Sequence, residues 1–144
     1  MYRILLVDDE WLELDTLEKY IPWEEMGFQV AGTAENGKEA LQLLERLEGS
    51  ENEEENDRKL PDVVLTDVKM PVMDGLEATR HIRGMTREDA RRIPIFALSA
   101  NAFADDIQRS LQCGMNTHFN KPVDMDSICA ALHYWLEHDK GNRP

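Results

Sequence analysis

Five residues that could serve one reaction each stand at the end of a short apolar run: Asp8, Asp9, Asp67, Ser99 and Lys121. Three carboxylates held close together repel one another, so at neutral pH they need a cation to stay ionised. Oxygen ligands with open water positions suit Mg²⁺. Lysine adds a positive point charge and serine a hydroxyl donor. The set favours phosphoryl transfer onto a carboxylate, giving an acyl phosphate held by metal, ammonium and hydroxyl.

Asp67 is the candidate nucleophile of this set. It ends an apolar run, rich in β-branched residues, that begins at Leu60, and the turn residues Pro71 and Gly75 follow it. This pattern predicts a buried strand that breaks into a loop at Asp67. A carboxylate at the carboxyl end of an inner strand is held rigidly and faces the crevice in which open α/β sheets bind their ligands.

The apolar runs that must position these residues alternate with segments of helical spacing. Five runs are predicted as strands, covering residues 4–7, 28–34, 60–67, 93–98 and 117–120. Each is followed by apolar residues at helical spacing, including Leu14 and Leu17, Ala40 and Leu44, Leu76 and Ile82, Ile107 and Leu111, and Ile128, Leu132 and Trp135. Five strand and helix pairs make an α/β fold with a parallel sheet. The carboxyl ends of its strands share one edge, so the five residues are expected to converge there.

The limits of several helices can also be predicted. Asn36 with Glu39, and Asp74 with Glu77, have the spacing of a capping box at a helix start. Pro22 is expected to end the first helix. A glycine at position 114 offers a stop for the fourth helix.

Length and composition favour one domain over residues 1–138. The chain has 144 residues, of which 42% are hydrophobic, enough for one substantial core. Residues 48–59 are acidic and nearly devoid of apolar side chains, so we expect a flexible insert there. Residues 139–144 are expected to be a tail or the start of a linker.

Charge and cysteine usage narrow the partners and the compartment. The formal net charge of -13 argues against direct binding of nucleic acid or an anionic membrane. The one dense basic group is interrupted by acids and is expected to be a solvated helix face with its following loop: Arg80, Arg83, Arg87, Arg91 and Arg92. Cys113 and Cys129 lack disulfide or zinc spacing, and no run is long enough to span a bilayer. A soluble cytoplasmic protein is therefore expected.

The motifs at the strand ends resemble a known family. Val7-Asp8-Asp9-Glu10, Thr66-Asp67-Val68-Lys69-Met70-Pro71 with Asp74-Gly75, Leu98-Ser99-Ala100 and Lys121-Pro122 are similar to the motifs of receiver domains of two-component response regulators. Each motif is weak alone, but four in the correct order at the correct strand ends are specific. The resemblance implies a flavodoxin-like (βα)5 fold with strand order 2-1-3-4-5 and helices on both faces of the sheet.

The resemblance also implies a role for each matching residue. Asp67 would accept a phosphoryl group from a histidine kinase or a histidine phosphotransfer protein in a Mg²⁺-dependent reaction. Asp9 would bind Mg²⁺ directly and Asp8 largely through water, with Asp67 and the backbone carbonyl of Lys69 completing the protein ligands. Lys121 would pair with the phosphoryl group, and Ser99 would be the switch hydroxyl.

Position 118 departs from the family pattern. An aromatic switch residue is usual three residues before the lysine, and here His118 stands there. A histidine can still rotate between buried and exposed states and could add a pH dependence. A half-exposed histidine with no special role is an equal alternative. The signal would reach the face formed by the fourth helix, the fifth strand and the fifth helix, through which a homodimer is plausible for the family.

Two other functions compete with the phosphorylated switch. A haloacid-dehalogenase-type phosphatase also uses a strand-end aspartate, but it needs a second aspartate two residues later as general acid. Lys69 occupies that place, so a signalling switch is favoured over an enzyme. A receiver-like interaction module that is never phosphorylated is the remaining alternative. All five site residues are present, so nothing in the sequence favours that module.

Overall fold

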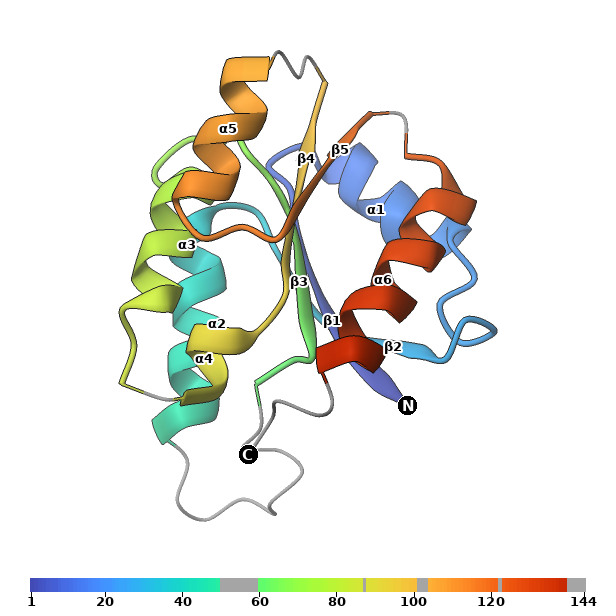
Figure 1. Cartoon of the computed structure of the whole chain (residues 1–144), viewed down its shortest axis with the longest axis horizontal. Helices are drawn as coiled ribbons and strands as arrows, with labels where there is room; N and C mark the ends of the chain where they lie inside the picture. The colour runs from blue at the N-terminus through green and yellow to red at the C-terminus, as the bar shows by residue number, and fades with distance from the viewer. Residues whose placement is uncertain (50–59, 87, 101–103, 122, 140–144) are drawn as a thin grey trace.

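The computed structural model describes residues 1–49, 60–86, 88–100, 104–121 and 123–139. Its centre is a parallel sheet of five strands in the order β2-β1-β3-β4-β5 (Figure 1). The strands are β1 (Tyr2–Val7), β2 (Phe28–Ala34), β3 (Val63–Asp67), β4 (Ile95–Ser99) and β5 (Thr117–Asn120). Both the fold class and the strand order agree with the prediction.

Helices cover both faces of this sheet (Figure 1). They are α1 (Trp11–Tyr20), α2 (Gly37–Gly49), α3 (Gly75–Arg83), α4 (Glu88–Arg92), α5 (Ala104–Gln112) and α6 (Met125–Asp139). The short α4 was expected to be part of a loop. The predicted fourth and fifth helices are therefore α5 and α6.

Two hydrophobic cores lie on the two faces of the sheet, because successive side chains of a strand point to opposite sides. Ile4 and Leu6 of β1 join the core under α1 and α6, together with Leu132. Leu5 and Val7 join the core under α2, α3 and α4. Figure 1 shows the same division, with α1 and α6 on one side of the sheet and the other helices opposite. Buried on both faces, the inner strands read as continuous apolar runs.

Local sequence signals set several boundaries. The Asn36 side chain accepts a hydrogen bond from the Glu39 amide at 2.9 Å, and Asp74 accepts one from the Glu77 amide at 2.8 Å. Both predicted capping contacts are therefore present at helix starts. Helix α1 ends one residue before Ile21, as Pro22 predicted. The fourth strand begins at Ile95 rather than at position 93, because Pro94 has no amide hydrogen for the ladder.

Two other expectations need comment. Helix α2 runs to Gly49, so the first two residues of the predicted insert, 48 and 49, are helical. The remainder of that insert, residues 50–59, and most of the predicted tail, residues 140–144, lie outside the described residues. Within the described part of the chain, no helix is long and apolar enough to cross a membrane.

Candidate functional site

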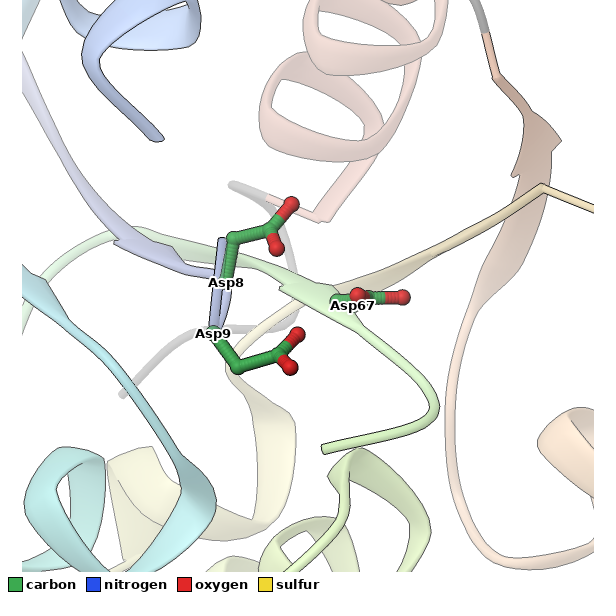
Figure 2. Close-up of side chains that lie close together, drawn as sticks. All are labelled: Asp8, Asp9 and Asp67. Carbon is green, nitrogen blue, oxygen red and sulfur yellow. The ribbon is translucent and has the colours of Figure 1, made fainter. Parts of the chain in front are cut away.

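Three carboxylates converge at the carboxyl edge of the sheet, as predicted. Asp8 and Asp9 follow β1, and Asp67 ends β3, the strand paired directly with β1. One oxygen from each side chain lies within 4.8 Å of the others, and Figure 2 shows the three carboxylates turned to the same side. Asp8 is 0% and Asp67 8% exposed, whereas Asp9 is exposed. This cluster of hard oxygen ligands can hold a divalent cation.

The register of the strands explains why these residues meet. Val7 pairs with Thr66, so Asp8 and Asp67 leave neighbouring strands at the same level of the sheet. The Asp8 amide donates to Ala34 of β2 at 3.0 Å, and its Oδ1 accepts from the Glu10 amide at 3.0 Å. The first bond holds the Asp8 backbone against β2, and the second orients its carboxylate.

Lys121 enters the same cluster from the end of β5. Its Nζ lies 2.9 Å from Asp8 Oδ2 and 3.4 Å from Asp67 Oδ2, and it also donates a hydrogen bond to Glu13 of α1. Burial lowers the pKa of Lys121, but the hydrogen bonds to Glu13 and Asp8 and the charge of Asp67 outweigh burial and raise it above its usual value. Lys121 is therefore a permanent cation at the site.

Burial has the opposite consequence for Asp67. It raises the pKa of this carboxyl to about 6, although Lys121 acts against the rise and the charge of Asp8 adds to it. At pH 7 the ionised form still predominates by about tenfold. Asp67 therefore presents a negatively charged oxygen that is poorly solvated, a combination that favours both cation binding and nucleophilic attack.

Two further predicted site residues lie near Asp67: Ser99 follows Leu98, the β4 partner of Asp67, and Lys69 comes two residues after Asp67 in the chain. Ser99 ends β4 and pairs with Asn120 of β5, and its carbonyl accepts from the Lys121 amide at 2.9 Å. The Val68 amide donates to Leu98 of β4 at 3.1 Å, which ties the start of the next loop to that strand. Lys69 follows in this loop, with an exposed side chain.

The loop between β3 and α3 is pulled against the sheet. The Gly75 amide donates to Val68 at 2.8 Å, and a Cβ at position 75 would lie only 2.4 Å from the Asp67 carbonyl oxygen. The Gly37 amide donates to Met73 at 2.8 Å and anchors the loop to α2. Glycine at position 75 is thus required by its close approach to the Asp67 carbonyl.

Val72 lies in the same loop and takes a φ of 68°, a region that β-branched residues rarely adopt.

His118 lies in β5 beside α5. Its Nδ1 is 3.3 Å from Ser110 Oγ of α5, whereas its buried Nε2 has no hydrogen-bond partner among the described residues. Burial lowers the pKa of His118, and the Asp106 carboxylate opposes this shift. The side chain is therefore half-buried against a helix rather than standing free at a strand end.

The contacts of two charged side chains, Glu13 and Arg83, were not predicted. Glu13 was not singled out, although it stands one helical turn before the buried Leu17 and hence on the side of α1 that approaches the sheet. Arg83 was expected on a solvated face, and this expectation is wrong. It is half-buried and donates to the Gly114 carbonyl at 3.0 and 2.8 Å, to the Ala90 carbonyl at 3.1 Å and to Asn116 Oδ1 at 2.9 Å. Arg80, Arg91 and Arg92 are exposed, and position 87 lies outside the described residues.

Known proteins share this arrangement. Residues 4–133 match the response regulator receiver domain family. "Probable histidine kinase 2" of Oryza sativa subsp. indica is 35% identical over 132 residues, which cover 91% of this chain and 12% of that protein. "Uncharacterized transcriptional regulatory protein YesN" of Bacillus subtilis is 31% identical over 92% of this chain and 32% of its own length. The chain therefore spans a third or less of either relative.

Solved structures give the same result. The receiver domain of the sensor histidine kinase PA1611 from Pseudomonas aeruginosa superposes with a TM-score of 0.72 at 32% identity, covering 94% of this chain and 98% of that domain. That structure has a magnesium ion coordinated in its active-site cleft. The sequence match, the strand order and the acidic cluster agree, and the chain belongs to the response regulator receiver domain family of two-component signal transduction.

Proposed function

We propose that this receiver is a phosphorylated switch in which Asp67 accepts a phosphoryl group from a histidine kinase or a histidine phosphotransfer protein. One observation carries the proposal: the oxygens of three carboxylates, including the nucleophile Asp67, lie within 4.8 Å of one another at one edge of the sheet, and the Lys121 ammonium is ion-paired with Asp8 and Asp67. An interaction module that is never phosphorylated does not account for Lys121 there, and Lys69 in place of the general acid argues against the phosphatase.

In the proposed reaction, an Asp67 carboxylate oxygen attacks phosphorus while the bond from phosphorus to the donor nitrogen breaks. Asp8, Asp9, Asp67 and the Lys69 carbonyl would hold Mg²⁺, which neutralises charge on the phosphoryl oxygens when bound. The ionised state of Asp67 at pH 7 makes it ready to attack without a separate base. Lys121 pairs with a phosphoryl oxygen, and the Ser99 hydroxyl donates to another.

The output of this switch would be a change in the face formed by α5, β5 and α6. Ser99 and His118 both belong to the strands at that side of the sheet, and His118 contacts α5 through Ser110. Movement of the Ser99 hydroxyl toward a phosphoryl group would alter the packing of His118, so a two-state equilibrium at Asp67 reaches the surface. No direct contact of this domain with nucleic acid or a membrane is part of the proposal.

The decisive experiment is incubation with Mg²⁺ and acetyl phosphate, followed by intact-mass measurement. The protein should gain one phosphoryl group, and Asp67→Asn should gain none. An unmodified protein at saturating donor would eliminate the phosphorylated switch and leave the interaction module. Asp15→Asn is the matched control, because Asp15 lies outside the acidic cluster, in an ion pair with Lys19 on α1.

The metal assignment has a separate test. Asp9→Ala should abolish Mg²⁺ binding measured by calorimetric titration, whereas Asp15→Ala should leave it unchanged. Unaltered Mg²⁺ binding in Asp9→Ala would show that the ligand assignment is wrong.

Dimerisation through the α5, β5 and α6 face is part of the same proposal. β5 is an edge strand, and Leu111 of α5 and Tyr134 of α6 are exposed apolar residues on its flanking helices. Size-exclusion chromatography with and without acetyl phosphate should show a donor-dependent shift to twice the mass. Leu111→Glu should suppress that shift, and an unchanged monomer in both conditions would reject the dimer.

A further inference from the structure

Lys121 is shared by three carboxylates at unequal contacts. Its Nζ donates hydrogen bonds to Asp8 and to Glu13, whereas Asp67 lies at 3.4 Å, beyond the usual range for an N–H···O bond. In the unphosphorylated chain the ammonium therefore makes its short hydrogen bonds to the two neighbours of the reactive carboxylate, and its contact with Asp67 itself is a longer ion pair. Glu13 is not part of the acidic cluster that can hold a metal.

The two hydrogen-bonded neighbours differ in how easily they can be released. The Asp8 side chain is 0% exposed, so losing its partner would leave a buried charge unpaired. The Glu13 side chain is 40% exposed, so water can replace Lys121 at little cost. Glu13 also lines a cavity of about 380 Å³ between α1 and the start of α6, which gives its carboxylate room to move.

A phosphoryl group on Asp67 would change the competition for Lys121. It would place several charged oxygens beside an ammonium that has only three N–H donors. Two donors are already used, so one remains for the phosphoryl group, whose more numerous charged oxygens would compete for a second donor as well. The exposed Glu13 is the contact that can be given up.

We propose that Glu13 is a positioning residue that holds Lys121 in the unphosphorylated receiver and releases it when Asp67 carries a phosphoryl group. This inference rests on the proposed function. It makes Glu13 a competitor of the phosphoryl group, so the resting hydrogen bond lowers the affinity of the site for phosphate analogues. It also links the state of Asp67 to α1, on the face of the sheet away from α5.

The first measurement is calorimetric titration of the full chain with beryllofluoride in the presence of Mg²⁺. Glu13→Gln should bind beryllofluoride about tenfold more tightly than the native protein, because a charge-assisted hydrogen bond no longer competes for Lys121. Glu18→Gln removes the same charge from an exposed position of α1 and should stay within about twofold. Equal or weaker binding by Glu13→Gln would overturn the inference.

The second measurement separates competition from a general effect of charge. In ¹⁵N-lysine-labelled protein, the Lys121 Nζ resonance is assigned by its loss in Lys121→Met. Glu13→Gln should move this resonance in the free protein and leave it unmoved in the complex with beryllofluoride and Mg²⁺. A resonance that Glu13→Gln moves equally in both states, or in neither, would overturn the proposal even if binding tightened.

These outcomes are distinct from failure of the proposed function. If the native protein forms no adduct with acetyl phosphate, the phosphorylated switch itself fails. If it forms the adduct but Glu13→Gln behaves as the native protein in both measurements, only the role of Glu13 fails.

Discussion

Two cations secure opposite ends of the sheet, and their partners differ in kind. At the carboxyl edge Lys121 faces three ionisable carboxylates, one of which, Glu13, is open to water. At the amino ends of β4 and β5 the partners of Arg83 among the described residues are neutral oxygens, including the Gly114 carbonyl and the Asn116 side chain. The Asn116 oxygen also accepts from the Ile95 amide at 2.8 Å, so Arg83 closes a network that joins α3, β4 and the start of β5.

The difference separates a stabilising contact from an exchangeable one. The Arg83 guanidinium has fixed geometry, and its acceptors are neutral carbonyl and amide oxygens whose charge does not change, so the network has one stable arrangement. The Lys121 ammonium is a compact charge on a flexible stem, with three carboxylates around its three donors. Such a site can rearrange when one acceptor changes. We therefore expect substitutions at the Arg83 end to change stability, and substitutions at the Lys121 end to change chemistry.

The largest effect should follow Arg83→Met. This change removes the four hydrogen bonds that Arg83 donates to the Gly114 and Ala90 carbonyls and to Asn116 Oδ1, and the free energy of unfolding should fall by about 3 kcal/mol. Urea denaturation measures this loss. Arg91→Met on the exposed side of α4 is the control and should change stability by less than about 0.5 kcal/mol. The contrast between the two ends breaks down if the folded Arg83→Met protein is also phosphorylated by acetyl phosphate much more slowly than the native protein.

The next largest effect should come from Asp67→Asn, in the opposite direction. Without Mg²⁺ at pH 7.5 the free energy of unfolding should rise by about 2 kcal/mol. Burial penalises the negative charge of Asp67, whereas the asparagine amide at the same place carries no charge. The folded pKa of about 6 lies above the ordinary 3.8, so native protein takes up a proton more readily than unfolded protein between these values. The penalty is therefore present above pH 6 and disappears as the pH falls toward 4.

The pH series sharpens this prediction. Denaturation at pH 7.5, 6 and 4.5 should show the advantage of Asp67→Asn shrinking toward acid. An advantage that stays constant over this range would mean that burial of charge is not what destabilises the carboxyl edge.

A smaller gain is expected at Val72, in the loop that follows Asp67. Its φ of 68° costs on the order of 1 kcal/mol, and asparagine tolerates this backbone region better than valine. The side chain is 74% exposed, so little packing is lost on substitution. Val72→Asn should raise the melting temperature by a few degrees. Val72→Thr keeps the β-branch and should give no gain; an equal gain from both would exclude backbone strain as the cause.

The smallest effect should be at His118, and it should depend on pH. Burial holds the pKa of this side chain below 6.5, so the unfolded chain takes up a proton first as the pH falls. Native stability should therefore decline below about pH 6.5 relative to His118→Phe, and the two proteins should be close at pH 7.5. Thermal melts of the two proteins below pH 6.5 and at pH 7.5 measure the difference.

The sequence was sufficient for the strands and for most of the site, for identifiable reasons. Apolar runs bounded by turn residues marked every strand to within two residues at its carboxyl end, and the parallel arrangement then brought Asp8, Asp9, Asp67 and Lys121 together. Capping side chains such as Asn36 and Asp74 carry their information within four residues. Each of these signals is local, or becomes local once strand ends share an edge.

Contacts between helices and distant loops could not be predicted in this way. Arg83 is one of several arginines along a polar stretch, and only the return of the chain at Gly114 gives it carbonyl partners. Glu13 is an ordinary acid in the first turn of α1 until β5 delivers Lys121 beside it. Helix α4 is five residues long and buries Ala90 alone among its described side chains, which is too little for a periodic pattern.

Gly75 gives the carboxyl edge a further property, which concerns tolerance to mutation. Any side chain at this position would press on the Asp67 carbonyl oxygen at 2.4 Å, so even alanine would push the reactive residue out of line. A methyl group at Gly84, just past the other end of α3, would meet no neighbour nearer than 3.4 Å, so alanine can be accepted there. Substitution is therefore excluded at the first residue of this helix and tolerated just beyond its last residue. The outer surface of α3 can change by mutation only while its junction with Asp67 keeps the glycine.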